Sequence, residues 1–230
     1  MVFNRLFSFL KAFKNMKLKK LGVLFALFIL PLVFYIFLSQ GIYKYANLPI
    51  LTEQVTDLSE FSPETTFKKH LTVLCFLGND VEDAKASLFN LNQTIYKRYN
   101  SKPLFQMVAI LPKGTEQAYS AAIDEMQAFV SIDKWHFVYL DPHEIDAVFT
   151  SLKTPFKLND QLYSENAMIV DMERRLRGRK DDEDSYNGKL YGYNMRSIAV
   201  LKNKMKDDID IIYYQLKKSA EKEARRKREI

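Results

Sequence analysis

The first long apolar run stands near the beginning of the chain. Residues 21–38 are all apolar or aromatic apart from Gly22 and Pro31, and no charged residue follows before Lys44. A helix over residues 21–43 is roughly 34 Å long, enough to cross a hydrocarbon core of about 30 Å. The pattern therefore predicts one transmembrane helix over residues 21–43, with a kink at Pro31 that membrane helices tolerate.

A cleaved signal peptide is the alternative for this segment. Its apolar region would span about 7–15 residues and would end in small residues at an A-x-A-like site. Here the run is longer, and residues 39–43, Ser-Gln-Gly-Ile-Tyr, contain no such site. The sequence favours an uncleaved anchor.

Farther along the chain, short apolar runs alternate with helical patterns. The predicted strands are residues 71–77, 105–111, 135–140, 167–170 and 175–177. The predicted helices are residues 80–99, 116–129, 145–152 and a long last helix from about Met195. Such alternation predicts a parallel sheet with right-handed crossovers, to which the last two strands add an antiparallel edge. The expected fold class is α/β, a thioredoxin-like mixed sheet with flanking helices, preceded by the transmembrane helix.

These patterns divide the chain into five segments. They are a basic amphipathic segment (1–20), the transmembrane helix (21–43), a tether (44–66) with a first short element around residues 55–61, the thioredoxin-like domain (67–217) and a charged helical tail (218–230). In the helix over 116–129, the side chains expected to point inward are Ala118, Ala122, Met126 and Phe129.

Charge predicts the orientation of the anchor. The chain has 34 basic and 28 acidic residues, and six of the basic ones lie within the first twenty positions, where no acid occurs. Flanking basic charge stays on the cytoplasmic side. Removing those six leaves 28 against 28, so the net charge of +6 belongs to the membrane flank and not to a nucleic-acid-binding surface. We expect a single-pass protein of the bacterial inner membrane with a periplasmic C-terminal domain.

Apolar residues recur at helical spacing before the anchor. They are Phe3, Leu6, Phe7, Leu10 and Phe13, with polar and basic residues between them. The pattern is typical of a helix lying in the membrane interface, with its lysines near anionic headgroups. A cytoplasmic extension of the anchor helix is the alternative.

Three short stretches share a resemblance to one family. Residues 171–178, Asp-Met-Glu-Arg-Arg-Leu-Arg-Gly, are similar to a D-x-x-G-x-(I/L)-R-G hairpin, with Arg174 at the turn glycine. Residues 134–137, Lys-Trp-His-Phe, resemble an N-W-x-F stretch, and residues 206–209, Lys-Asp-Asp-Ile, resemble a terminal D-I helix. Together they resemble the Sco/SenC family, membrane-anchored thioredoxin-like proteins that deliver copper to cytochrome oxidase. The resemblance covers about residues 50–217.

That family holds copper with two cysteines of a C-P-x-x-C-P loop and a distant histidine. Matching residues 75–77 to its aromatic strand puts Asp80 and Ala84 at the cysteine positions and Tyr163 at the histidine position. Thiolates suit Cu(I) because both are soft. Asp, Ala and Tyr form no Cu(I) site and carry out no dithiol–disulfide exchange. The resemblance therefore implies no catalytic residue, no metal ligand and no cofactor in this chain.

The remaining candidates for chemistry are few. Cys75 is the single cysteine and lies inside an apolar run, where a free cysteine is usually a small buried hydrophobe. His70, His136 and His143 have no carboxylate spaced to complete a metal site. Asp141, His143 and Glu144 could cluster at the carboxyl end of a strand, but turn formation and helix capping explain them better.

Two charged stretches remain open to interpretation. Residues 174–180 carry five basic side chains and residues 181–184 four acidic ones. Such blocks usually form a solvated, mobile loop, and the alternative is a docking element for an oppositely charged partner. The basic tail over 217–228 extends the last helix, exposed to water or touching headgroups or a partner.

The leading hypothesis is a non-catalytic, Sco-like protein anchored in the lipid bilayer. It would act as an assembly factor or accessory subunit of a membrane protein complex, and the resemblance makes a respiratory oxidase the natural candidate. The alternative is a copper-handling or thiol-redox protein that completes its site with a partner, using Asp80, Cys75 or Tyr163. A third possibility is a small-molecule site in the vacated pocket near Asp80 and Tyr163.

Overall fold

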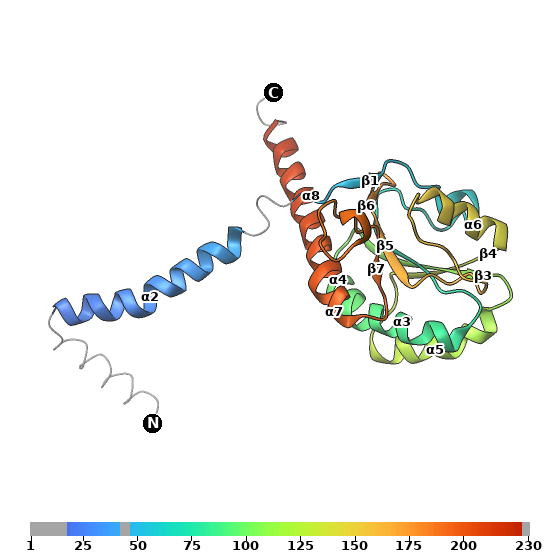
Figure 1. Cartoon of the computed structure of the whole chain (residues 1–230), viewed down its shortest axis with the longest axis horizontal. Helices are drawn as coiled ribbons and strands as arrows, with labels where there is room; N and C mark the ends of the chain where they lie inside the picture. The colour runs from blue at the N-terminus through green and yellow to red at the C-terminus, as the bar shows by residue number, and fades with distance from the viewer. Residues whose placement is uncertain (1–17, 42–46, 227–230) are drawn as a thin grey trace. The chain divides into compact units, whose positions relative to one another are not determined.

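The computed structural model describes residues 18–41 and 47–226 (Figure 1). The chain forms two units, residues 1–46 and residues 47–230. In the first unit, α2 (Leu18–Gly41) contains Pro31. Across the described residues, no helix combines the length and the apolar character needed to cross a membrane. The transmembrane helix over 21–43 therefore stays a prediction, and most of the amphipathic segment 1–20 lies outside the described residues.

A mixed sheet forms the centre of the second unit. Its strands follow the order β1-β6-β5-β2-β3-β4, with β7 paired to β5. Their bounds are β1 (Ile50–Thr52), β2 (Leu71–Phe76), β3 (Phe105–Pro112), β4 (Trp135–Leu140), β5 (Asn166–Val170), β6 (Leu176–Arg177) and β7 (Tyr193–Asn194). Strands β2, β3 and β4 are parallel, whereas β5 is antiparallel to both β2 and β6.

Helices cover both faces of this sheet (Figure 1). The longer ones are α3 (Val81–Leu91), α5 (Glu116–Phe129), α6 (Pro142–Ser151) and α8 (Lys206–Arg226). The short helical segments are η1 (Leu58–Glu60), η2 (Asn92–Tyr96), α4 (Lys97–Tyr99), η3 (Tyr186–Gly188), α7 (Ile198–Val200) and η4 (Leu201–Met205). Helices α3, α5 and α8 pack into one core, and α6 packs into the other.

The arrangement of the central strands identifies the fold. In the order β6-β5-β2-β3, a parallel pair joined through a helix lies beside an antiparallel hairpin. This order, with helices on both faces, is the thioredoxin-like plan. The predicted α/β fold class is confirmed for this unit of the chain.

Strand β2 is central because its residues are apolar on both faces. Every residue of β2 is buried. Val73 and Cys75 enter the core under α3 and α5, while Leu74 and Phe76 enter the core under α6. A parallel strand covered on both sides reads as a continuous apolar run, which is why the sequence located it.

The stretch assigned to a tether belongs largely to the domain. Within residues 44–66, β1 pairs with β6, and Val55 and Leu58 are fully buried. The Thr52 hydroxyl donates to the Leu152 carbonyl oxygen over 2.7 Å. The prediction failed here because a three-residue edge strand is too short to show a periodic pattern.

One predicted helix face is wrong in part. In α5 the buried side chains are Tyr119, Ala122 and Met126. Ala118 is exposed, and Phe129 is 68% exposed at the end of the helix. Ala122 and Met126 are buried as predicted, and Tyr119 lies in the interior in place of Ala118.

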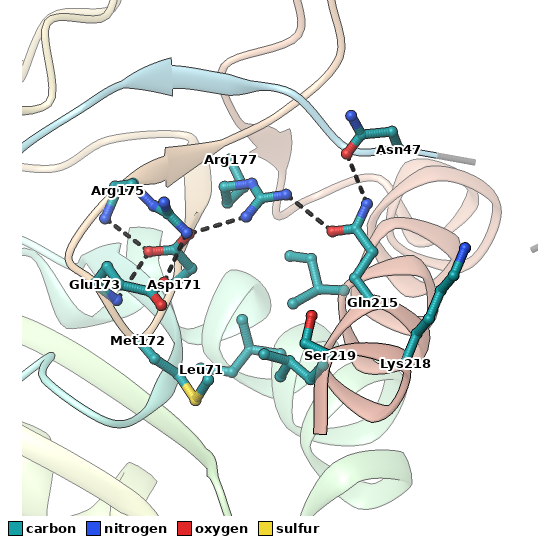
Figure 2. A pocket seen from close by; sticks show the side chains of 12 residues that line it. Asn47, Leu71, Asp171, Met172, Glu173, Arg175, Arg177, Gln215, Lys218 and Ser219 are labelled. Carbon is teal, nitrogen blue, oxygen red and sulfur yellow. Dashed lines mark hydrogen bonds and ion pairs between the residues drawn. The ribbon is translucent and has the colours of Figure 1, made fainter. Parts of the chain in front are cut away.

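A buried ion pair joins four segments of the domain, and we call it the Asp171–Arg177 clamp. The two side chains lie 2.9 Å apart, and both are almost completely buried. The Arg177 guanidinium also donates to the Leu48 carbonyl oxygen and to Gln215 Oε1, the latter over 3.0 Å (Figure 2). It therefore connects β5 and β6 with the chain before β1 and with α8.

The clamp also determines the charge state of Asp171. Burial alone would raise the pKa of this carboxyl. Hydrogen bonds from Arg175 and Arg177 outweigh burial and hold the Asp171 pKa below its usual value. Asp171 therefore stays ionised at neutral pH, which satisfies the buried guanidinium.

The charged run over 174–184 is solvated only in part, with Lys180, Asp181, Glu183 and Asp184 exposed. Arg179 Nε lies 2.9 Å from Asp208 Oδ2, and Lys204 Nζ lies 2.8 Å from Asp182 Oδ1. Asp182 and Asp208 are 5% and 1% exposed. The prediction of a solvated, mobile loop is wrong for these side chains, because they form ion pairs that fasten the loop to the last helix.

The hairpin before that run explains the D-x-x-G-x-(I/L)-R-G resemblance. Arg174 has a φ of +64°, a left-handed conformation that favours glycine. At Gly178, an added Cβ would lie 2.1 Å from the Leu190 carbonyl oxygen, so no side chain fits there. Arg174 thus carries strain at the position where the resembling family has glycine.

We expect Arg174→Gly to stabilise the domain. It removes a left-handed side chain that costs about 1–2 kcal/mol and adds about 0.5–1 kcal/mol of unfolded-chain entropy. Chemical denaturation should therefore show a gain of about 0.5–1 kcal/mol in the free energy of unfolding. Lys157→Gly, at an exposed loop position without a positive φ, is the control and should lower that free energy. Equal effects of both changes would contradict the strain argument.

Candidate functional site

The candidate site is the junction where β2 ends and α3 begins. Leu77 forms a bridge with Tyr163, and Gly78 then turns the chain with a φ of +67°. A Cβ at Gly78 would lie 2.3 Å from the Gln161 carbonyl oxygen. Glycine is therefore required here on both conformational and steric grounds, and it brings residues 161–163 against the start of α3.

The two positions matched to cysteines lie at the first turn of α3. Asp80 is exposed, and its carboxylate accepts a hydrogen bond from the Asp83 amide over 3.2 Å, which caps the helix. Ala84, one turn later, is fully buried. At these positions the chain has a capping carboxylate and a packed methyl group.

The position matched to histidine faces the same helix. Tyr163 is 4% exposed, and its hydroxyl lies 2.8 Å from the Ser87 hydroxyl on α3. The Arg196 guanidinium lies 5.6 Å from the centre of the Tyr163 ring and forms an ion pair with Asp83. The structure thus brings Tyr163 against α3, where the two hydroxyl groups form a hydrogen bond.

Tyr119 closes the interior side of the junction. Its hydroxyl donates to the carbonyl oxygens of Leu77 and Gly78 over 2.8 and 3.1 Å. Burial raises the pKa of Tyr119, and the nearby Cys75 and Asp80 raise it further. The phenol therefore stays neutral and acts as a fixed donor to the turn.

Cys75 lies inside this structure and has no access to solvent. It is fully buried in β2, and its Sγ lies 3.6 Å from the Val108 carbonyl oxygen. Burial raises the pKa of the Cys75 thiol far above its usual value. The structure confirms that Cys75 is a buried packing residue, and since the thiolate is the reactive form, its inertness stays a prediction.

The three histidines do not join this site. His70 and His136 are half-buried. Burial lowers the pKa of His136, and the charge of nearby His70 lowers it further. His143 is exposed on α6. Within residues 18–41 and 47–226, no three His, Cys, Asp or Glu side chains are grouped to hold a metal ion.

Asp141 and Glu144 have a structural role at the start of α6. The Asp141 amide donates to Glu144 Oε2 over 2.8 Å, and Lys113 Nζ lies 2.6 Å from Asp141 Oδ2. The first contact is one half of a capping box, whose other half pairs the Asp141 side chain with the Glu144 backbone amide. The capping interpretation of these residues is confirmed.

A pocket of about 570 Å³ lies beside the Asp171–Arg177 clamp, between the β5–β6 turn and α8 (Figure 2). Leu71, Ile212 and Leu216 are among its apolar lining residues. Its charged wall is satisfied internally, since Arg175 pairs with both Asp171 and Glu173. We therefore infer that these charged residues hold the β5–β6 hairpin against α8.

Sequence reasoning missed Ser87, Tyr119 and Arg196 at the junction. Ser87 lies three residues after Ala84, so helical spacing could have placed it on the same face. Tyr119 and Arg196 come from distant segments, and no local pattern connects them with residues 78–84.

No family model and no curated protein matches the chain. Similar solved structures include BsSco, a member of the Sco family of cytochrome c oxidase assembly proteins, at 14% identity and a TM-score of 0.45, covering 72% of this chain and 95% of that one. A SCO1/SenC family lipoprotein from Bacillus anthracis is 11% identical with a TM-score of 0.42, and the match covers 74% of this chain and 98% of that one. The thioredoxin domain of a thiol-disulfide oxidoreductase from Bacteroides vulgatus is 17% identical with a TM-score of 0.41, and the match covers 69% of this chain and 98% of that one. Sco-family and thioredoxin-like structures are thus among those to which the chain is similar.

We expect native Cys75 to resist thiol reagents. Exposing it requires opening a core that costs several kcal/mol, so labelling at pH 8 should be roughly 1000-fold slower than in denaturant. The absorbance of the chromophore that a disulfide reagent releases on labelling measures both rates. Ser101→Cys places a second thiol at an exposed position and should react at once, as the positive control. Fast labelling of wild-type protein would contradict the inert assignment.

Proposed function

We propose that this chain is a membrane-anchored, thioredoxin-fold binding protein that has no copper or thiol-redox chemistry of its own. It acts as an assembly factor or accessory subunit of a membrane protein complex at the outer face of the bacterial inner membrane. A respiratory oxidase is the candidate complex, and that suggestion comes from the Sco/SenC resemblance alone.

The β2–α3 junction is the observation that carries this proposal. Asp80 and Ala84 lie at the first turn of α3, Tyr163 contacts the same helix through Ser87, and none of the three supplies a soft donor at the positions that the family match assigns to copper ligands. Tyr163 is already paired with Ser87, and Tyr119 with the turn. The scaffold of a metal-handling fold is retained, while the donor atoms that give such a site its chemistry are replaced.

The anchor is part of the proposal because of its sequence. The apolar run over residues 21–38 lies within α2, and no charged residue occurs from residue 21 to residue 43. Six basic residues precede it and predict a cytoplasmic N-terminus. The lipid bilayer is thus the first proposed partner, and the charge-balanced domain supports no role in nucleic-acid binding.

Recovery from membranes tests the proposed function. We expect the full chain to stay in the membrane pellet after a carbonate wash, and to elute in mild detergent together with other membrane subunits. Size-exclusion chromatography with mass spectrometry of chemically crosslinked membranes measures both outcomes. Recovery in the wash would overturn the anchor, and elution solely as a lone monomer would overturn the role in a complex.

Restoring the soft ligands tests whether the junction is correctly matched. We expect the wild-type chain to bind Cu(I) no tighter than about micromolar in competition with a chromophoric chelator. The triple variant Asp80→Cys, Ala84→Cys, Tyr163→His should bind at least about 1000-fold tighter, because two thiolates and an imidazole then converge. The control pair Ser101→Cys, Gln117→Cys adds two exposed thiols elsewhere. Tight binding by the wild-type chain would instead favour copper handling.

A further inference from the structure

A basic groove lies between two helical segments of the domain. It has a volume of about 570 Å³ and runs between the η2–α4 segment and the η4–α8 boundary. Every lining side chain carries a hydrogen-bond donor, and none is a carboxylate. The lining residues are Gln93, Thr94, Lys97, Arg98, Lys202, Asn203 and Lys206.

These donors come from two helical segments, which form the two rows of the groove. Gln93, Thr94, Lys97 and Arg98 belong to the η2–α4 segment, and Lys202, Asn203 and Lys206 to the η4–α8 boundary. All of them line one pocket, so the cations lie along it from both segments.

Acids at the rim neutralise the groove only in part. Arg98 lies 3.3 Å from Asp210, and Lys206 lies 2.9 Å from Asp207. Lys97 and Lys202 are exposed and take part in no ion pair among the described residues. Four cations against two acids leave a local charge of +2.

This charge is local and does not reflect the composition of the domain. All 28 acidic residues lie after residue 46, where 27 of the 34 basic residues also lie, so this part of the chain has a net charge of −1. The groove therefore concentrates positive charge on a domain that is otherwise slightly acidic. Charge complementarity then selects an acidic occupant.

We propose that this groove binds an acidic polypeptide segment of the partner, an inference that rests on the proposed function and names the surface it uses. Phosphate sites in proteins commonly use converging backbone amides at a helix N-terminus or nest. Here the donors are side chains within continuous helical segments, set in two rows. Carboxylates distributed along a polypeptide match that distribution better than one compact anion does.

A labelled peptide of alternating glutamate and alanine tests the groove in the detergent-solubilised full chain. Fluorescence anisotropy should show binding that weakens as salt rises, because the contacts are exposed ion pairs. The variant Lys97→Glu, Lys202→Glu should bind about tenfold more weakly. The control Lys68→Glu, Lys157→Glu changes the same charge at exposed positions elsewhere and should stay within twofold. Equal losses in both variants would overturn the proposal.

A photocrosslinking residue locates the bound peptide despite the basic N-terminal segment. At Asn203, in the groove, benzoylphenylalanine should crosslink to the peptide, and at the exposed Gln117 on α5 it should not. Two outcomes would assign the groove to phosphate groups and overturn the proposal. One is displacement of the peptide by millimolar inorganic phosphate. The other is that Lys97→Glu, Lys202→Glu weakens binding to phosphatidylglycerol vesicles and leaves peptide binding unchanged. Co-purification with a complex that survives Lys97→Glu, Lys202→Glu would leave the proposed function intact and refute the groove.

Discussion

The Asp171–Arg177 clamp is the interaction on which the rest of the domain depends. It joins the hairpin of β5 and β6 to the chain entering β1 and to α8, segments that are far apart in the sequence. A buried guanidinium without its carboxylate is strongly destabilising, whereas the intact pair is satisfied on every side. The clamp thus makes the docking of the last helix and the closing of the sheet edge a single event. A second set of ion pairs, from Arg179 to Asp208 and from Lys204 to Asp182, fastens the following loop to the same helical region.

The junction between β2 and α3 is held by backbone contacts and by side-chain hydroxyl groups. Gly78 and the Tyr119 hydroxyl hold the turn after β2, and both act on the backbone, so neither depends on metal ligands. A hydrogen bond between the hydroxyl groups of Ser87 and Tyr163 joins α3 to the segment before β5. Cys75, three residues before Gly78 in β2, is shielded from solvent by burial. The shape of the junction is therefore set by packing and by hydrogen bonds among its described residues.

Sequence reasoning was accurate where burial leaves a local pattern. Strands β2, β3 and β4 are apolar runs with clear ends, and α5 begins and ends where periodicity indicates. It failed where long-range contacts decide the outcome. Nothing in residues 47–66 reveals that β1 pairs with β6, and the charges of Arg179 and Asp182 resemble those of a solvated loop until Asp208 and Lys204 are in place. At the candidate site, the family match located Asp80, Ala84 and Tyr163, whereas Tyr119 and Arg196 reach it by tertiary folding alone.

Two of the helices contain π-turns, η2 within residues 81–99 and η4 within residues 198–226. Each π-turn holds one residue more than an α-turn, so the helix beyond it is rotated by about 100° relative to an uninterrupted helix. In the last helix this rotation aims Ile209 and Ile212 at the sheet. Deleting one residue within η4 would restore regular winding and swing that apolar stripe away from the core. Chain length is consequently fixed to the residue in these two helices, and natural insertions and deletions should concentrate in exposed turns such as the one at Gly114.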